Sequence, residues 1–444
     1  MSGYSDGGAS LRSTLLRDWL PDVRSAESDI DANWDVLRRR SGDLARNSAI
    51  GAAAIGAMVR GVIGSGIKVY PRLEESVWGL EERRSWERGV RQAFERWTRE
   101  CDYAGRNTFY ELQSLLYELM LTDGDVFCVY RRVSEGELSL RLQVIEGGRV
   151  YSDVGSGAVN GCRLDHRHRL YSISVANHFP REAPTSFHTI LARNQANQPN
   201  FLHICQDLRA NQIRGVPLLA PVIVNIKQLH RFSLAELSSA IVKSFFSLFF
   251  VQPQTDFDLN DVLGRDSIDL SDIKLGSGTL TALPQGVDVK AVDSSHSIST
   301  FSLFNQVFEK HIAAAIGIPA EVLFQSFQSS YSASRAALLQ AYDEFKRRRL
   351  FFIHDFVQPV YLMWLQEAVA RRIVHAPGFF SDPHQRELFS QADFFGPALP
   401  ALDPLKEMQA AKLRVDAGVS SWQREAAELT GTDFFQNIQD QPEL

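Results

Sequence analysis

Cysteine is scarce in this chain, and recognisable catalytic motifs are missing. The 444 residues include four cysteines that lie far apart, Cys101, Cys128, Cys162 and Cys205. Their spacing fits neither a zinc knuckle nor a short disulfide framework, which favours a reducing, cytosolic compartment. The G-x-S-x-G, H-E-x-x-H and phosphate-loop patterns are also absent. These absences favour a structural or binding role, and we predict no enzymatic activity, no cofactor and no metal.

Excess positive charge and long apolar runs are missing too. The formal net charge is -6, which gives no overall sign of a nucleic-acid-binding surface. The most apolar segment, residues 237–251, contains Lys243 and is shorter than the roughly 20 residues that span a bilayer. We expect a helix buried between subunits there, with a membrane-anchored channel as the alternative. The polar first residues predict no signal peptide.

The chain does contain a long helical pattern between residues 301 and 372. Its first part has one apolar stripe with a spacing of three or four residues: Phe301, Phe304, Phe308, Ile312 and Ile316. Gly317 and Pro319 predict the end of this helix. A second, longer helix follows the polar loop, capped by Ser332 or Ser334 and bent at Pro359.

Helices and strands are predicted elsewhere as well. Helical spacing covers 31–62 in two pieces, 81–101, 109–119, 217–250 and, after Asp403, a final pair capped by Asp403 and by Ser420 or Ser421. Period-two patterns predict strands within 125–133, 138–146, 149–154, 161–176 and 201–206. Residues 376–400 read as an irregular connection, and the last eleven residues as a frayed end. The fold class is therefore α+β and predominantly α-helical.

An abrupt change in composition occurs between residues 251 and 293. Eight acids, Asp256, Asp258, Asp261, Asp266, Asp269, Asp272, Asp288 and Asp293, face three bases, Arg265, Lys274 and Lys290. A calcium loop does not fit, because Asp261 stands where glycine is needed and Ser267 where glutamate is needed. We predict a small acidic β-module inserted between two long helices.

One other stretch suggests a metal but does not complete a site. Asp165, His166 and His168 include alternate strand positions that would share a face, yet no distant third ligand is evident. An exposed turn is the simpler interpretation.

Four blocks of sequence, in this order and spacing, resemble the portal proteins of lambda-like tailed phages. The blocks are LRRRSGDLARNSAIGAAAIGAMVRGVIGSGIK, QIRGVPLLAPV, LGSGTLTALPQGVDVKAV and GIPAEVLFQ followed by YSASRAALLQAYDEFKRRR. The resemblance implies a ring of about twelve copies at one capsid vertex, through which terminase packages double-stranded DNA and from which DNA is later ejected. It also implies contacts with the major capsid or scaffold protein and with head-completion or tail proteins. The location would be the virion, and the host cytoplasm during assembly.

The resemblance assigns names to the parts of an elongated portal fold. A flexible lead (1–30) precedes the wing (31–216), a stem helix (217–250), the clip (251–293), a second stem helix (294–317), the tunnel loop (318–333), a long kinked wing helix with its connection (334–400) and the crown (401–444). The alternative is a nucleotide-hydrolysing DNA-packaging enzyme, against which the missing phosphate loop argues.

Three groups of candidate functional residues follow. For the DNA channel they are Gln325, Ser326, Gln328, Ser329, Ser330 and Tyr331, which are uncharged and would touch a phosphate backbone without gripping it. For partner docking they are Asp256, Asp258, Asp261, Asp266, Asp269 and Asp272. For the subunit interface they are Phe245, Phe246, Phe249 and Phe250, in a segment that is apolar all round.

Overall fold

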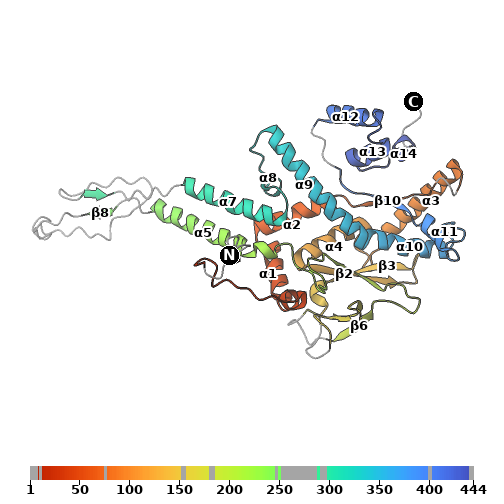
Figure 1. The fold of residues 1–444 in the computed structure, drawn as a ribbon, viewed down its shortest axis with the longest axis horizontal. Coiled ribbons are helices and arrows are strands. Elements are labelled where there is room, and N and C mark those ends of the chain that lie inside the picture. The colour runs from red at the N-terminus through yellow and green to blue at the C-terminus, as the bar shows by residue number, and fades with distance from the viewer. Residues whose placement is uncertain are drawn as a thin grey trace, which may run out of the picture. The chain divides into compact units, whose positions relative to one another are not determined.

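A computed structural model of the chain describes residues 9, 13–74, 78–151, 157–179, 186–245, 249–251, 288–290, 298–398 and 403–439. The chain divides into two units, which we treat separately. The first contains Met1–Pro221 and Ile316–Leu444, and the second contains Val222–Ala315. Figure 1 shows the order of the elements.

Two short helices begin the first unit, after the π-helical turn η1 (Glu27–Asp31). They are α1 (Trp34–Asn47) and α2 (Ala49–Val62), as the sequence predicts. Ser48 caps α2 by accepting a hydrogen bond from the Gly51 amide. The small residues of α2 allow close packing: a Cβ at Gly61 would lie 2.4 Å from the Phe345 ring.

Two three-stranded antiparallel sheets lie in the described part of this unit, in addition to a two-stranded pair given below. The strands of one, in spatial order, are β3 (Leu140–Glu146), β2 (Asp125–Arg132) and β7 (Phe201–Cys205); those of the other are β4 (Cys162–Leu164), β5 (Leu170–Ala176) and β6 (Phe187–Leu191). The apolar residues shared between them include Phe127, Ile173 and Phe201. The strand expected at 149–154 is not formed by its described part, where Val150 makes only an isolated bridge to Val175.

Helices pack around these strands. α4 (Phe109–Asp123) contacts β2 and is capped by Thr108 and Glu111. α3 (Leu80–Thr98) precedes it and contacts β1 (Lys68–Pro71), which pairs with β10 (Ala392–Phe395). β10 and α11 (Pro383–Phe389) lie in the stretch expected to be irregular, so that expectation is wrong for these residues.

The long helical run consists of three consecutive parts. They are α9 (Tyr331–Phe352), the π-helical segment η5 (Ile353–Val357) and α10 (Gln358–Ala370). Pro359 lies in the first turn of α10, so the regular helix is interrupted where proline predicts it. The buried side chains of Trp364 and Phe94 meet edge to face at 5.0 Å between ring centroids.

In the residues of the second unit that the structure describes, there are two helices and a short strand pair. These are α5 (Ile223–Phe245), which follows the 3₁₀ turn η3 (Ala220–Val222), then β8 (Phe249–Val251), β9 (Asp288–Lys290) and α7 (Ile298–Ile316). The helix predicted over 217–250 is therefore shorter at both ends, and residues 249–251 are a strand. The Phe232 and Phe304 rings, 4.2 Å apart, hold α5 and α7 together.

Three short helices lie in the last part of the chain that the structure describes, residues 403–439. α12 (Pro404–Asp416) and α13 (Trp422–Thr430) are capped by Asp403 and Ser421, as predicted. α14 (Phe434–Gln439) occupies residues that were expected to fray, which was wrong. The fold class, α+β with helices predominating, is confirmed.

Candidate functional site

The polar loop between α7 and α9 is shorter than predicted. Gly317, with a φ of +92°, ends α7, and the small helix α8 (Ala320–Leu323) follows. Ser330 caps α9 by accepting a hydrogen bond from the Ala333 amide at 3.4 Å, so the predicted caps Ser332 and Ser334 were wrong. Tyr331 is consequently the first residue of a helix and not part of the loop.

All six predicted channel residues are exposed: Gln325, Ser326, Gln328, Ser329, Ser330 and Tyr331. Gln325 adopts a left-handed backbone conformation, with φ of +55°. The base of the loop is held by Ile318 and Leu323, both buried. Phe327, 48% exposed at the middle of the loop, was not among the predicted residues. The loop therefore has an uncharged tip, residues 324–330, which is exposed from Gln325 onward, and an apolar base.

A buried ion pair lies where the chain approaches α5. The Arg214 guanidinium donates to both Asp125 oxygens, from Nε to Oδ2 at 2.6 Å and from Nη2 to Oδ1 at 2.8 Å. Its remaining hydrogens reach the carbonyls of Val150, Asn160 and Gly147 at 2.5–2.8 Å. Every guanidinium donor is thus used, which is what a buried arginine requires.

Backbone contacts tighten the same junction. The Gly215 amide donates to Asp125 Oδ2 at 3.2 Å. A Cβ at Gly215 would lie 1.9 Å from the carbonyl oxygen of Gly124, so only glycine fits this crossing. The Trp34 ring covers the guanidinium, with Cζ of Arg214 at 3.9 Å from the ring centroid. Arg214 and Gly215 both belong to the QIRGVPLLAPV block. Arginine is needed at 214 for the buried ion pair, and glycine at 215 for the close backbone crossing.

The electrostatics of the junction differ from one carboxyl to the next. Burial alone would raise the pKa of Asp125, but the Arg214 charge and the hydrogen bonds from Arg214 and His203 hold it well below its usual range. Burial raises the pKa of Asp31 to about 6 and that of Asp123 to about 6, against weaker opposing interactions. The paired carboxylate is therefore locked in its charged form, whereas its two neighbours titrate near pH 6.

The α5–α7 pair exposes apolar side chains on its outer faces. The ones that are 48–66% exposed are Val224, Leu234, Leu237, Ile241, Leu303 and Val307. On α5, Leu234, Leu237 and Ile241 recur every three or four residues and so share one face. Apolar surface gathered in this way is typical of a binding or assembly surface.

Several predicted residues fall beyond what the structure describes. The six acidic docking residues, Asp256, Asp258, Asp261, Asp266, Asp269 and Asp272, lie outside the described residues, as does Phe246. Phe245 is the last residue of α5, while Phe249 and Phe250 belong to β8. Their assignments to partner docking and to the subunit interface stay predictions.

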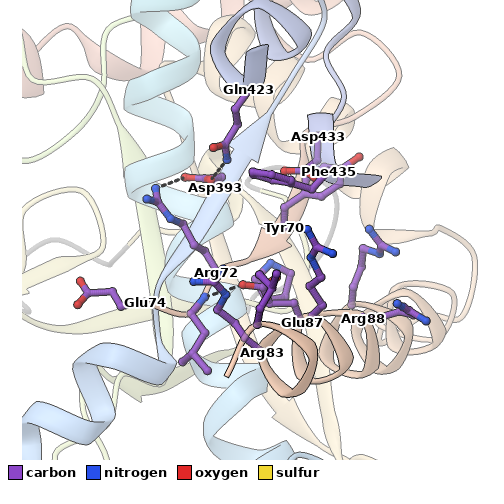
Figure 2. A pocket seen from close by; sticks show the side chains of 15 residues that line it. Tyr70, Arg72, Glu74, Arg83, Glu87, Arg88, Asp393, Gln423, Asp433 and Phe435 are labelled. Carbon is purple, nitrogen blue, oxygen red and sulfur yellow. Dashed lines mark hydrogen bonds and ion pairs between the residues drawn. The ribbon is translucent and has the colours of Figure 1, made fainter. Parts of the chain in front are cut away.

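A cleft opens between α3, the β1–β10 pair and the C-terminal helices (Figure 2). Its volume is about 570 Å³, and its described lining includes five arginines: Arg72, Arg83, Arg84, Arg88 and Arg91. Two of the dashed lines in Figure 2 mark the interactions of Asp393 with Arg72, at 3.9 Å, and with Gln423, at 3.5 Å. No local pattern in the sequence indicates this cleft, because its walls come from distant parts of the chain.

The Asp165 stretch forms a turn. Its carboxylate accepts hydrogen bonds from the Arg167 and Arg169 amides and pairs with the Arg169 side chain, which leaves it engaged in shaping the loop. Among the residues that the structure describes, no group of His, Cys, Asp or Glu is arranged to hold a metal ion. Within the same residues, none of the helices combines the length and the apolar character needed to cross a bilayer.

A family model described as "Phage portal protein, lambda family" matches residues 12–349. The chain belongs to the lambda family of phage portal proteins. This confirms the family that the four sequence blocks indicated and, with it, the role of head–tail connector.

Individual portal proteins align over almost the whole chain. Portal protein B of Escherichia phage lambda is 24% identical, with 98% of this chain and 87% of that protein covered. The portal protein of Escherichia phage N15 is 25% identical, with 98% of this chain and 88% of that protein covered.

Among solved structures, the chain is similar to one in the neck of the native gene transfer agent (GTA) particle computed with C12 symmetry. The TM-score is 0.48 and the identity 14%, with 89% of this chain and 94% of that one covered. A chain from the neck of the empty particle computed with C6 symmetry gives a TM-score of 0.49 and 14% identity, with coverage of 87% and 92%.

Proposed function

We propose that this portal protein assembles into a ring of about twelve copies around a channel, at one vertex of the capsid. Double-stranded DNA is packaged through the channel by terminase and later leaves through it. The observation that carries the proposal is the apolar outer surface of α5 and α7, because a monomer would leave it in water. Leu237 is 57% exposed and Leu303 65% exposed. Contact with the same helices of neighbouring copies removes this surface from solvent.

The other parts take roles around this ring. The uncharged tip at 324–330 lines the narrowest part of the channel and touches DNA in passing, since it offers hydrogen bonds without a strong electrostatic grip. The acidic segment 251–293 docks terminase during packaging, and head-completion or tail proteins afterwards. The major capsid or scaffold protein surrounds the ring in the virion, and assembly takes place in the host cytoplasm. The portal family has a structural role, and the absence of enzymatic activity in this chain is part of the proposal.

A matched pair of substitutions tests the assembly surface. Ile241 on α5 and Leu191 on β6 are each 48% exposed. Ile241→Glu places a charge in the proposed interface, whereas Leu191→Glu places the same charge on the sheet. We expect light scattering to give about twelve times the 49.9 kDa chain mass for the wild-type protein and for Leu191→Glu, and a much smaller mass for Ile241→Glu.

Negative-stain images of the same samples show whether the large species are rings with a central hole. A stable wild-type monomer at micromolar concentration contradicts the proposal. Normal assembly of Ile241→Glu places the interface elsewhere, and equal loss in both variants shows a general effect of the added charge.

A further inference from the structure

The cleft between α3 and the C-terminal helices has the composition of a binding site for an anion. Its described lining contains arginine but no lysine. Arginine presents a planar fork of donors that matches phosphate, and it stacks on aromatic rings, whereas lysine acts as a point charge. Which arginines can bind a ligand depends on which of them are already paired with carboxylates of the protein.

The carboxylates of the cleft have partners within the protein. Glu87 accepts a hydrogen bond from the Leu73 amide at 2.9 Å, and Glu74 accepts one from Gln391 at 3.0 Å. Asp393 interacts with Arg72 and Gln423, and Asp433 also has a partner. In Figure 2, Glu74 points away from the other labelled side chains. The acids therefore stabilise the walls of the cleft.

Three arginines on α3 are left to face a ligand. Arg84, Arg88 and Arg91 are spaced i, i+4 and i+7, so they share one face at intervals of about 6 and 4.5 Å along the helix. Arg88 is exposed and forms no ion pair with any carboxylate that the structure describes. The nearest carboxylate of Arg84 is Glu81 at 3.9 Å, an exposed contact of little strength.

Two aromatic rings stand beside this row. Cζ of Arg84 lies 6.0 Å from the ring centroid of Phe435, and Cζ of Arg91 lies 5.9 Å from that of Tyr70. The Phe435 residue is 46% exposed, so its ring is available to a ligand. A positively charged row next to an accessible aromatic ring is the combination by which proteins bind single-stranded nucleic acid, with phosphates on the cations and a base on the ring.

We propose that this cleft binds single-stranded DNA. Successive phosphates lie along Arg84, Arg88 and Arg91, and an unstacked base packs on Phe435. A cleft of about 570 Å³ admits a nucleotide or two of one strand, whereas a duplex keeps its bases stacked inside and offers only its backbone. The proposal rests on the proposed function in one respect, that DNA is the nucleic acid this protein meets. It is separate from the loop at 324–330.

The test is fluorescence anisotropy with a labelled oligothymidylate of about ten nucleotides and the full-length protein. The variant Arg84→Gln/Arg88→Gln/Arg91→Gln removes the row. The control Arg96→Gln/Arg99→Gln/Arg106→Gln removes three exposed arginines at the other end of α3 and just beyond it. We expect the Arg84/Arg88/Arg91 variant to bind the oligonucleotide at least tenfold more weakly and to reduce the slope of log K against log salt by about 2. The control variant should change neither the affinity nor the slope. Phe435→Ala should weaken binding several-fold with the slope unchanged, because stacking releases no counterions.

Three outcomes overturn the proposal. If both triple variants lose the same affinity for the oligonucleotide, the binding is general electrostatic attraction. If the Arg84/Arg88/Arg91 variant loses the same affinity for a hairpin duplex as for the single strand, the row contacts a duplex backbone. Competition by polyglutamate as strong as by unlabelled oligothymidylate shows a site for an acidic protein segment. Ring formation, measured on the same samples by light scattering, is expected to stay normal, so its loss bears on the proposed function and not on the cleft.

Discussion

Arg214 and Asp125 form a two-point ion pair in which both side chains are fully buried. They are 89 residues apart in the sequence. The pair joins the start of β2 to the segment that leads into α5, and the carbonyls around it are satisfied by the same guanidinium. These contacts fix the backbone of residues 214 and 215 against the start of β2.

Removing either partner should destabilise the first unit strongly. Asp125→Asn leaves a buried guanidinium without its counter-charge, and Arg214→Lys cannot supply five donors. Each should lower the free energy of unfolding by about 3–5 kcal/mol. Arg209→Lys is the control, because its partner Asp29 is 44% exposed and such pairs contribute about 0–1 kcal/mol. Thermal or urea unfolding measures the loss in the free energy of unfolding for each variant. Similar losses at the buried pair and at the Arg209–Asp29 pair would contradict this prediction.

Stability should depend on the ionisation of Asp31. Its pKa is raised from 3.8 to about 6 by burial, so the folded state keeps a proton that the unfolded state releases as pH rises through this window. Stability is therefore lost between about pH 4 and pH 6. Asp31→Asn cannot ionise, so its advantage over the wild-type protein should grow from near zero at about pH 4 to at most about 3 kcal/mol above about pH 6.

Urea unfolding at several pH values, followed by circular dichroism, checks this dependence. The control Asp18→Asn, whose side chain is 87% exposed, should show no such trend. An advantage of Asp31→Asn that is the same at every pH would mean that the carboxyl does not titrate with folding.

Charge at the tip of the loop should slow DNA passage. Introducing arginine at Gln325 and Gln328, both exposed, adds contacts that hold phosphates, so packaging in vitro should slow or stop at low salt and recover at higher salt. Arginine at Gln92 and Gln195, exposed on other parts of the chain, is the control. Ring assembly should be normal in both. A normal packaging rate for the doubly substituted loop at low salt would show that the loop does not meet DNA.

The segment between β8 and β9 should be separable from assembly. Val251 and Asp288 are opposite each other in this antiparallel pair, so a short Gly-Ser turn can replace residues 252–287 without moving the strands. We expect this variant to form rings but to lose binding to terminase in a pull-down experiment.

A milder variant tests whether the charge itself is responsible. Asparagine at the six acidic docking residues should weaken the same binding while keeping the segment in place. If the turn variant no longer forms rings, the segment is part of the assembly surface instead.

The sequence by itself determined most helices and the family. Helical periodicity is local: a stripe such as Phe304, Phe308 and Ile312 already defines the buried face, and a glycine such as Gly317 already ends the helix. The caps Asp403 and Ser421 act on amides only three residues away. The order of four sequence blocks identified the portal family because it samples most of the chain. These features depend on neighbours in sequence, so reading along the chain was sufficient.

Only the tertiary structure decided the contacts between distant segments. Lys68 pairs with Phe395 in β1–β10, although both strands are short and carry weak patterns. The Arg214–Asp125 pair and the arginine cleft likewise unite residues whose local sequence does not specify a partner. Pairing of this kind depends on which surfaces pack together in the fold. A buried charge without a partner is strongly unfavourable, and its partner comes from a segment that is distant in the sequence.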